Sequence, residues 1–246
     1  GDHRDLHTAY RRQRQMCIRD RANNPFLRQA HKRFHDMYVL DENPDYEPLP
    51  SQSIKALAIE QNKSPLELCL DILTRGSGKE MIYYAFLNYG ESSLDPAKEM
   101  MEHPNTILGL GDGGAHCGSI CDGSFTTHML THWTRDRKRG EKFKLPWVVK
   151  AHCHDTAAAV GLRDRGVLAP GYKADINIVD LKKMKLQKPE VHYDLPAGGR
   201  RLMQFADGYV ATIVSGVPIF LNGRSTGARP GRLVRGSQPR PKFQDH

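Results

Sequence analysis

Two glycine-rich segments constrain the fold of this chain more than any other feature. Residues 109–116 read Gly-Leu-Gly-Asp-Gly-Gly-Ala-His, and residues 161–175 read Gly-Leu-Arg-Asp-Arg-Gly-Val-Leu-Ala-Pro-Gly-Tyr-Lys-Ala-Asp. Glycine permits tight turns and the close approach of other groups. The first segment therefore places the carboxylate of Asp112 on an open turn directly after an apolar run. The second is expected to lead from a helix end into a new set of strands.

The residues before Asp112 predict alternating helices and strands. Apolar side chains recur at helical spacing in residues 52–61 and 65–75, and a third short helix is expected from 95 to about 103. Continuous apolar runs of strand length cover 81–89 and 106–110. Strands that are apolar on both faces and alternate with helices are typical of a parallel α/β sheet. Asp112 would then lie at the carboxyl end of a strand, where the catalytic groups of β/α barrels collect.

The residues after Asp112 predict helices and then short strands. Helices are expected at residues 125–135, 147–153 and 156–160. Gly161 suits the position that follows the last of these helices. Apolar runs bounded by glycine then occur at residues 175–180, 210–214 and 218–221. We expect these runs to be antiparallel strands of a small sheet.

The net charge of +8 is concentrated at the two ends of the chain. Residues 1–35 contain nine Lys or Arg and three Asp or Glu, and residues 221–246 contain six and one. Because the body between them is nearly neutral, we expect no nucleic-acid partner. Within the basic N-terminal arm, residues 15–21 resemble the in-frame translation of a sequencing adapter. Either the first twenty or so residues are an artefact of sequencing, or the arm is a genuine solvated segment.

Location and redox state follow from composition. The chain has no run of 18 or more apolar residues, and its charged first residues lack the apolar centre of a signal peptide. Its five cysteines are an odd number, which argues against a disulfide framework. We therefore expect a cytoplasmic protein with reduced thiols and no membrane partner.

Asp112 is the strongest candidate for a catalytic residue. A hydrolase that attacks an amide needs a carboxylate that takes a proton from water and passes it to the leaving amine. The two glycines after Asp112 would leave room for a metal ion and a substrate. An Asp-Gly-Gly sequence is also common in simple turns, so the motif has a structural explanation as well.

Residues 105–235 resemble the N-acyl-D-amino-acid deacylase (D-aminoacylase) branch of the amidohydrolase superfamily. In that branch the last barrel strand ends in Ser-Asp-Gly or Ser-Asp-Ala-Gly-Ala-His, and this chain has Gly111 in place of the serine. The second family motif, Gly-Leu-x-Asp-Arg-Gly-x-Leu-x-Pro-Gly-x-x-Ala-Asp, is matched by residues 161–175. A closing Thr-Gly-x-x-Pro-Gly is matched by residues 226–231.

The resemblance implies an α/β fold: the C-terminal part of a TIM-like (β/α)8 barrel with part of a small β-sandwich domain. The barrel part would span residues 36–165 and the β domain 166–225, between the arm of residues 1–35 and a tail of residues 226–246. The resemblance also implies zinc as the cofactor, with Asp112 as a metal ligand and the general acid/base.

Two further residues are candidates for substrate contacts. His116 lies in the matched segment and would touch the substrate or a metal ligand, or it is a loop histidine bonded to backbone. Asn88 follows the run 81–89, where the family lines its pocket, and it is the residue there most expected to face solvent. For Tyr83, Tyr84 and Phe86 core packing is the better interpretation.

A structural zinc site elsewhere is disfavoured, although cysteine and histidine are zinc ligands. Cys117 and Cys121 have no matching second pair of cysteines. His152 and His154 would point about 200° apart on a helix. The family's metal-binding His-x-His follows the first barrel strand, not a helix after Asp112.

The chain is expected to be a C-terminal fragment of such an enzyme, inactive by itself. A β/α barrel takes roughly 250 residues, but only 111 precede Asp112, and the family's other metal ligands have no recognisable counterpart. The expected substrate of the whole enzyme is an N-acyl-D-amino acid. One alternative is a cyclic amidase, hydantoinase-like or dihydroorotase-like, from the same superfamily. Another is a non-catalytic interaction domain with basic arms. The sequence indicates no oligomeric state.

Overall fold

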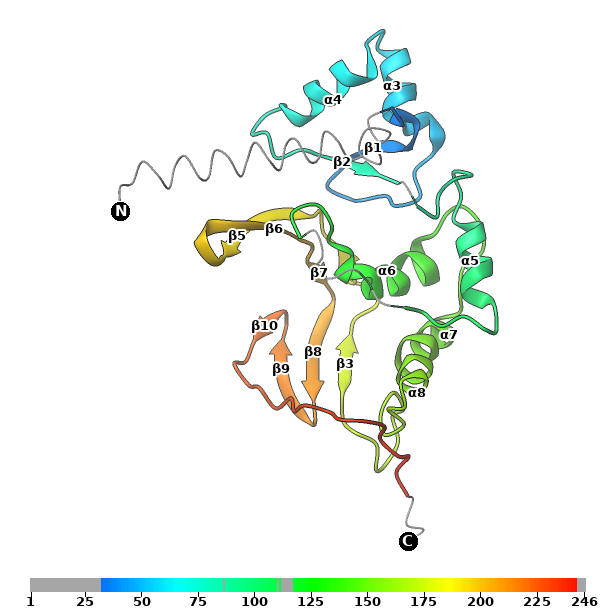
Figure 1. Cartoon of the computed structure of the whole chain (residues 1–246), viewed down its shortest axis with the longest axis vertical. Helices are drawn as coiled ribbons and strands as arrows, with labels where there is room; N and C mark the ends of the chain where they lie inside the picture. The colour runs from blue at the N-terminus through cyan, green and yellow to red at the C-terminus, as the bar shows by residue number, and fades with distance from the viewer. Residues whose placement is uncertain (1–31, 86, 110, 112–116, 243–246) are drawn as a thin grey trace. The chain divides into compact units, whose positions relative to one another are not determined.

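The computed structural model describes residues 32–85, 87–109, 111 and 117–242 (Figure 1). The chain forms two compact units. Unit 1 contains Gly1–Leu40 and Asp45–Ser92, and unit 2 contains Asp41–Pro44 and Ser93–His246. Within the described residues, no helix is long and apolar enough to cross a bilayer.

Unit 1 packs two helices against a two-stranded antiparallel sheet. The sheet pairs β1 (Met37–Leu40) with β2 (Met81–Tyr84). The helices are α3 (Ile54–Glu60) and α4 (Pro65–Leu73). Each helix begins at a serine whose hydroxyl accepts a hydrogen bond from a backbone N–H of the first turn, a local signal that the sequence carried. The buried core of the unit contains Ile54, Ala58, Leu68, Cys69 and Ile72.

The two helices of unit 1 confirm the expectation from periodicity, but the expected parallel pairing of the run 81–89 is wrong. Its strand covers only β2 and runs antiparallel to β1. Both faces of β2 make contacts, and its four residues are half-buried. Ile82 packs on the helical core, and Tyr83 makes an edge contact with Tyr46 at 5.3 Å between ring centroids. An apolar run indicates contacts on both faces of a strand, but it does not indicate whether the neighbouring strand is parallel or antiparallel.

The helical part of unit 2 has a continuous aromatic core. It consists of α5 (Asp95–Glu102), α6 (Phe125–Thr131) with the π-helical turn His132–Asp136, and a helix of three parts, α7 (Leu145–Lys150), the π-helical turn Ala151–Asp155 and α8 (Thr156–Ala159). Met129, Trp133, Phe143 and Val148 form the buried cluster between them. The helical residues predicted after Asp112 are thus confirmed, but the helices predicted at 147–153 and 156–160 form one continuous helix. Gly161 follows with φ of 77°, a conformation that glycine adopts without strain.

The expected strand at 106–110 is absent from its described part, residues 106–109. Leu108 packs against the aromatic cluster, whereas Ile107 is 55% exposed. The run therefore supplies one core contact, and no described strand pairs with it. Apolar composition alone predicted the strand, but a strand also needs a partner for its backbone groups.

A buried arginine joins the segments of this helical part. Arg137 is 1% exposed. Its guanidinium donates to Asp95 Oδ1 at 2.7 Å and to the carbonyl of Glu141 at 2.7 Å. It also lies 4.7 Å from the centroid of the Trp133 ring. Hydrogen bonds from Arg137 and from the Ser93 hydroxyl hold the pKa of Asp95 below its usual value.

The second part of unit 2 is built from short antiparallel strands. The main sheet has the order β10-β9-β8-β3, from β3 (Ile176–Val179), β8 (Tyr209–Val214), β9 (Val217–Leu221) and β10 (Arg224–Ser225). Two further pairs are β4 (Lys185–Leu186) with β7 (Ala206–Asp207) and β5 (Glu190–Leu195) with β6 (Gly199–Met203). The antiparallel sheet was predicted, but the β5–β6 hairpin was not. Its strands lack the apolar alternation of a half-buried strand, and none of their residues is fully buried.

We predict that Arg137→Met lowers the free energy of unfolding by about 2–4 kcal/mol, because it removes hydrogen bonds made by a buried charged group. Chemical denaturation followed by circular dichroism measures this value. Lys138→Met is the matched control, since Lys138 is the exposed neighbour and its replacement should change stability by less than about 0.5 kcal/mol. Equal losses in the two variants would contradict the structural role of Arg137.

Candidate functional site

The structure describes part of the predicted site. Asp112 and His116 lie outside the described residues. Asn88 is described in unit 1, where it is exposed with φ of 57° on the turn after β2. The expected exposure of Asn88 is confirmed, and its contact with a substrate stays a prediction. Tyr83 packs in unit 1 as expected, and burial raises the pKa of its hydroxyl.

Gly111 shows where the chain lies immediately before Asp112. A Cβ atom added to Gly111 would come within 2.9 Å of the carbonyl oxygen of Asp122 and 3.0 Å of Cδ1 of Phe125. The backbone of Gly111 therefore lies directly against the start of α6. This close packing explains a glycine at the position where the resembling family has serine, because a Cβ there would require the neighbouring backbone to shift.

Histidines line the same region of unit 2. The ring of His152 lies 5.8 Å from that of Phe125, which is the residue in contact with Gly111. One turn along α6, the rings of His128 and His132 stack at 4.7 Å with an angle of 11° between their planes. Burial, together with the neighbouring His132, lowers the pKa of His128 to about 3, and burial also lowers the pKa of His152. His128 is therefore a neutral group at physiological pH.

The described residues do not provide a metal centre. Among them, no three His, Cys, Asp or Glu side chains converge so that they could hold an ion. His152 and His154 belong to the π-helical turn Ala151–Asp155, where His154 contacts the carboxylate of Asp155 at 2.8 Å. This part of the chain therefore does not fit the zinc ion that the resemblance implies.

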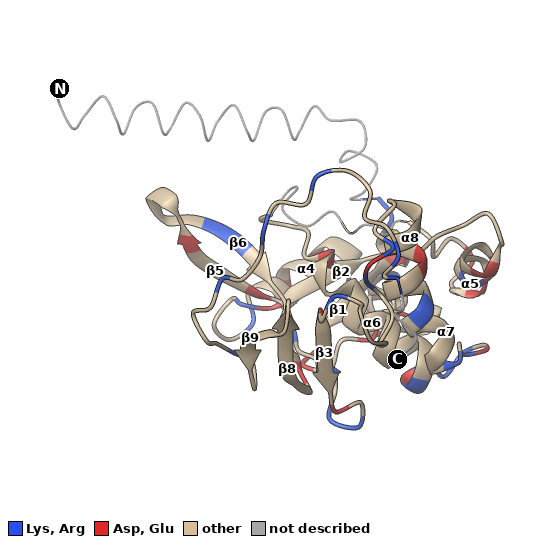
Figure 2. Cartoon of the chain, turned by 90° about the horizontal axis from the view of Figure 1, so that it is seen from below, with Lys and Arg blue, Asp and Glu red and all other residues tan. Residues whose placement is uncertain are grey.

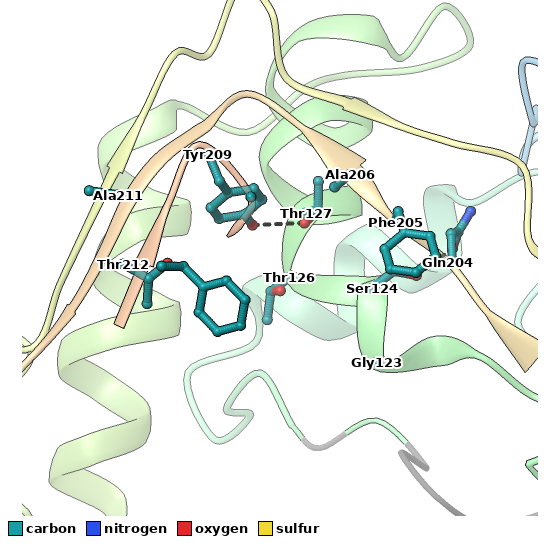
Figure 3. Close-up of a pocket in the computed structure, with 12 residues that line it drawn as sticks. Gly123, Ser124, Thr126, Thr127, Gln204, Phe205, Ala206, Tyr209, Ala211 and Thr212 are labelled. Carbon is teal, nitrogen blue, oxygen red and sulfur yellow. Dashed lines mark hydrogen bonds between the residues drawn. The ribbon is translucent and has the colours of Figure 1, made fainter. Parts of the chain in front are cut away.

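A pocket of about 350 Å³ opens between α6 and the strands of the β part (Figure 3). Thr127 and Tyr209 face each other across it, with 2.8 Å between their hydroxyl oxygens. At its other end Ser124 donates to Gln204 at 2.5 Å. Phe205 and Phe220 add aromatic surface. The pocket offers hydroxyls and rings but no carboxylate or imidazole among its lining residues, so its walls are suited to holding a group and not to moving protons.

This pocket could not be predicted from the sequence. Its two walls are about 80 residues apart in the chain, as the Thr127–Tyr209 contact shows. Threonine, serine and phenylalanine at these positions match no catalytic motif. Only the pairing of β8 with its neighbours, which brings Tyr209 beside α6, creates the pocket. No signal in a single sequence reports such a contact.

The comparison with known families is decisive for the class of protein. Residues 5–220 match the model of the amidohydrolase family. The chain belongs to the amidohydrolase family. No curated protein and no solved structure matches it significantly. Family membership supports a hydrolase, and amidohydrolases typically bind metal ions. The mixed α/β structure is consistent with part of an amidohydrolase.

We predict that Gly111→Ala lowers the free energy of unfolding by about 1–3 kcal/mol, because the new methyl group meets the Asp122 carbonyl and the Phe125 ring. Gly109→Ala is the control, since no atom lies within 4 Å of a Cβ at that position. Thermal and chemical unfolding of both variants test the prediction. If both variants unfold like the wild type, Gly111 is not closely packed.

We also predict that His128 makes stability depend on pH. The pKa of His128 is about 3 in the folded chain and about 6.5 in the unfolded chain. The unfolded state therefore binds more protons between these values, and stability is complete above about pH 6.5 and falls as the pH is lowered towards 3.

Between pH 7 and pH 5 the wild type should lose about 2 kcal/mol more than His128→Gln. The exposed His103→Gln variant should follow the wild type. Denaturation curves at the two pH values give both differences. The same pH dependence in wild type and His128→Gln would show that His128 is not protected from protonation.

Proposed function

We propose that this amidohydrolase removes the acyl group from N-acyl-D-amino acids, hydrolysing a linear amide bond, as the C-terminal part of a longer enzyme. The family match, which spans both glycine-rich segments, supports a hydrolase of this superfamily, and the observation that favours N-acyl-D-amino acids is the D-aminoacylase-like motif of residues 161–175. The first segment supplies the carboxylate, and the second carries the branch-like motif of residues 161–175. A cytoplasmic location and a small-molecule substrate are part of the same proposal.

Asp112 would move the proton in this reaction. An amide is a poor electrophile and an amine is a poor leaving group, so hydrolysis needs a base for the attacking water and an acid for the departing nitrogen. A single carboxylate can do both in turn, first accepting the proton of the water and then donating it to the nitrogen of the amino acid. The packing of Gly111 against Asp122 and Phe125 supports this role, because it fixes the backbone from which Asp112 continues.

We propose zinc as the cofactor. The described residues do not form a site for it. The family typically binds metals, and metal ions in hydrolases lower the pKa of bound water. We propose Asp112 as one ligand and His116 as a residue close to the metal or the substrate. Asn88 is proposed to contact the substrate.

The alternative is a cyclic amidase of the hydantoinase or dihydroorotase type. It belongs to the same superfamily and would use a carboxylate in the same way, so the family match favours neither substrate class. The two proposals differ in the bond that is hydrolysed, which is exocyclic in an N-acyl amino acid and lies within a ring in a hydantoin.

The proposal is tested by activity assays on the protein that is expressed when the open reading frame is extended upstream. The assays contain added zinc. We predict release of free amino acid from N-acetyl-D-amino acids, with little release from the L-isomers and none from hydantoins. Asp112→Asn should lower kcat about 10²- to 10⁴-fold with little change in KM, because it removes proton transfer and not binding.

The control is Asp122→Asn, whose residue contacts Gly111 through its backbone carbonyl and not through its carboxylate. This variant should retain most of the activity. Full activity of Asp112→Asn would contradict the proposed role of that residue. Hydrolysis of hydantoins in place of N-acetyl-D-amino acids would replace the proposal with the cyclic amidase.

A further inference from the structure

A small hollow lined by arginines lies in unit 2. It measures about 30 Å³, and its polar lining consists of Arg163, Arg165, Arg240, His154 and Tyr172. Arg163 and Arg165 belong to the second glycine-rich segment, and Arg240 belongs to the C-terminal segment. Neither the catalytic proposal nor the family match, which ends at residue 220, assigns a role to this hollow.

The hollow is assembled by two segments that are far apart in the sequence. The N–H of Arg163 donates to the carbonyl of Gln238 at 3.0 Å, and the N–H of Gln238 donates to the carbonyl of Gly161 at 2.8 Å. The C-terminal segment also lies close to the second glycine-rich segment at Pro241, because a Cβ on Gly171 would lie 3.0 Å from the Pro241 ring. Arg240 therefore lies between two positions, Gln238 and Pro241, at which the C-terminal segment contacts the second glycine-rich segment.

The charges around the hollow are only partly compensated. Arg165 forms a pair with Asp164, with Nε 2.8 Å from Oδ1, and it lies 3.5 Å from Asp175. Asp175 is shared with Lys173 at 3.3 Å. Within the described part of the chain, Arg163 and Arg240 have no ion pair with a carboxylate. Arg163 and Arg240 thus line the hollow without a carboxylate partner among the described residues, whereas the lining His154 contacts the carboxylate of Asp155 at 2.8 Å.

Figure 2 marks the positions of Lys and Arg in blue and those of Asp and Glu in red along the described ribbon. Guanidinium groups bind oxyanions through two parallel N–H donors, and phosphate is a preferred partner because it presents several acceptor oxygens. The hydroxyl of Tyr172 adds a polar group to the same wall. The small volume suits a single tetrahedral group whose remainder extends into solvent.

We propose that this hollow binds a phosphate group, either as inorganic phosphate or as the phosphate of a monoester. The tetrahedral anion lies between Arg163 and Arg240, and Arg165, held in place by Asp164 and Asp175, forms the floor of the site. The site is independent of amide hydrolysis, and it couples the C-terminal segment to the turn after α8, because the anion contacts both.

Isothermal titration of the 246-residue chain with inorganic phosphate and, separately, with glycerol 3-phosphate tests the proposal. We expect saturable binding with one site per chain. The Arg163→Ala/Arg240→Ala double variant should weaken the binding at least about tenfold. Tighter binding of glycerol 3-phosphate than of phosphate would identify a monoester as the ligand, and the reverse order would identify the free ion.

The matched control is Arg224→Ala/Arg229→Ala, which removes the same charge at exposed positions outside the hollow and should change the affinity less than about twofold. Arg163→Lys/Arg240→Lys retains the charge without the paired donors and should give an intermediate affinity. Circular dichroism verifies the fold of each variant. Absence of saturable binding to both ligands, or equal weakening by the control pair, would overturn the proposal.

Discussion

The buried guanidinium of Arg137 is the contact on which the helical part of unit 2 depends. It reaches α5 through Asp95, the loop after the π-helical turn through the carbonyl of Glu141, and the aromatic core through Trp133. Arg137 is 1% exposed. A buried guanidinium is stable only while its N–H donors have hydrogen-bond acceptors. These contacts hold α5, the loop at Glu141 and the π-helical turn after α6 together.

The contact of Gly111 with the start of α6 relates the fold to the proposed chemistry. Gly111 lies against the carbonyl of Asp122 and the ring of Phe125, and Phe125 lies near His152. The glycine is required by packing, because any side chain would displace backbone. The catalytic role of Asp112 is a proposal that rests on its place in the first glycine-rich segment.

Sequence patterns predicted local structure well and long-range pairing poorly. Helical periodicity and the serine caps located α3 and α4, and the glycine-bounded runs located β3, β8 and β9, because these signals lie within one segment. The direction of β2 and the absence of a strand at 106–109 depend on which chain lies alongside. The pocket beside Tyr209 and the arginine hollow also depend on distant pairing. Composition and spacing contain no record of such neighbours, so these features required the structure.

A crystal structure of the extended enzyme with a bound, non-hydrolysable N-acyl-D-amino acid analogue would test the central claim most directly. The measured quantity is the distance from the carboxylate of Asp112 to the atom that replaces the scissile nitrogen. We predict a distance within hydrogen-bond range, about 2.6–3.2 Å, with Gly111 still packed against Phe125. A carboxylate that points to solvent, with another acidic residue beside the amide, would contradict the assignment of Asp112.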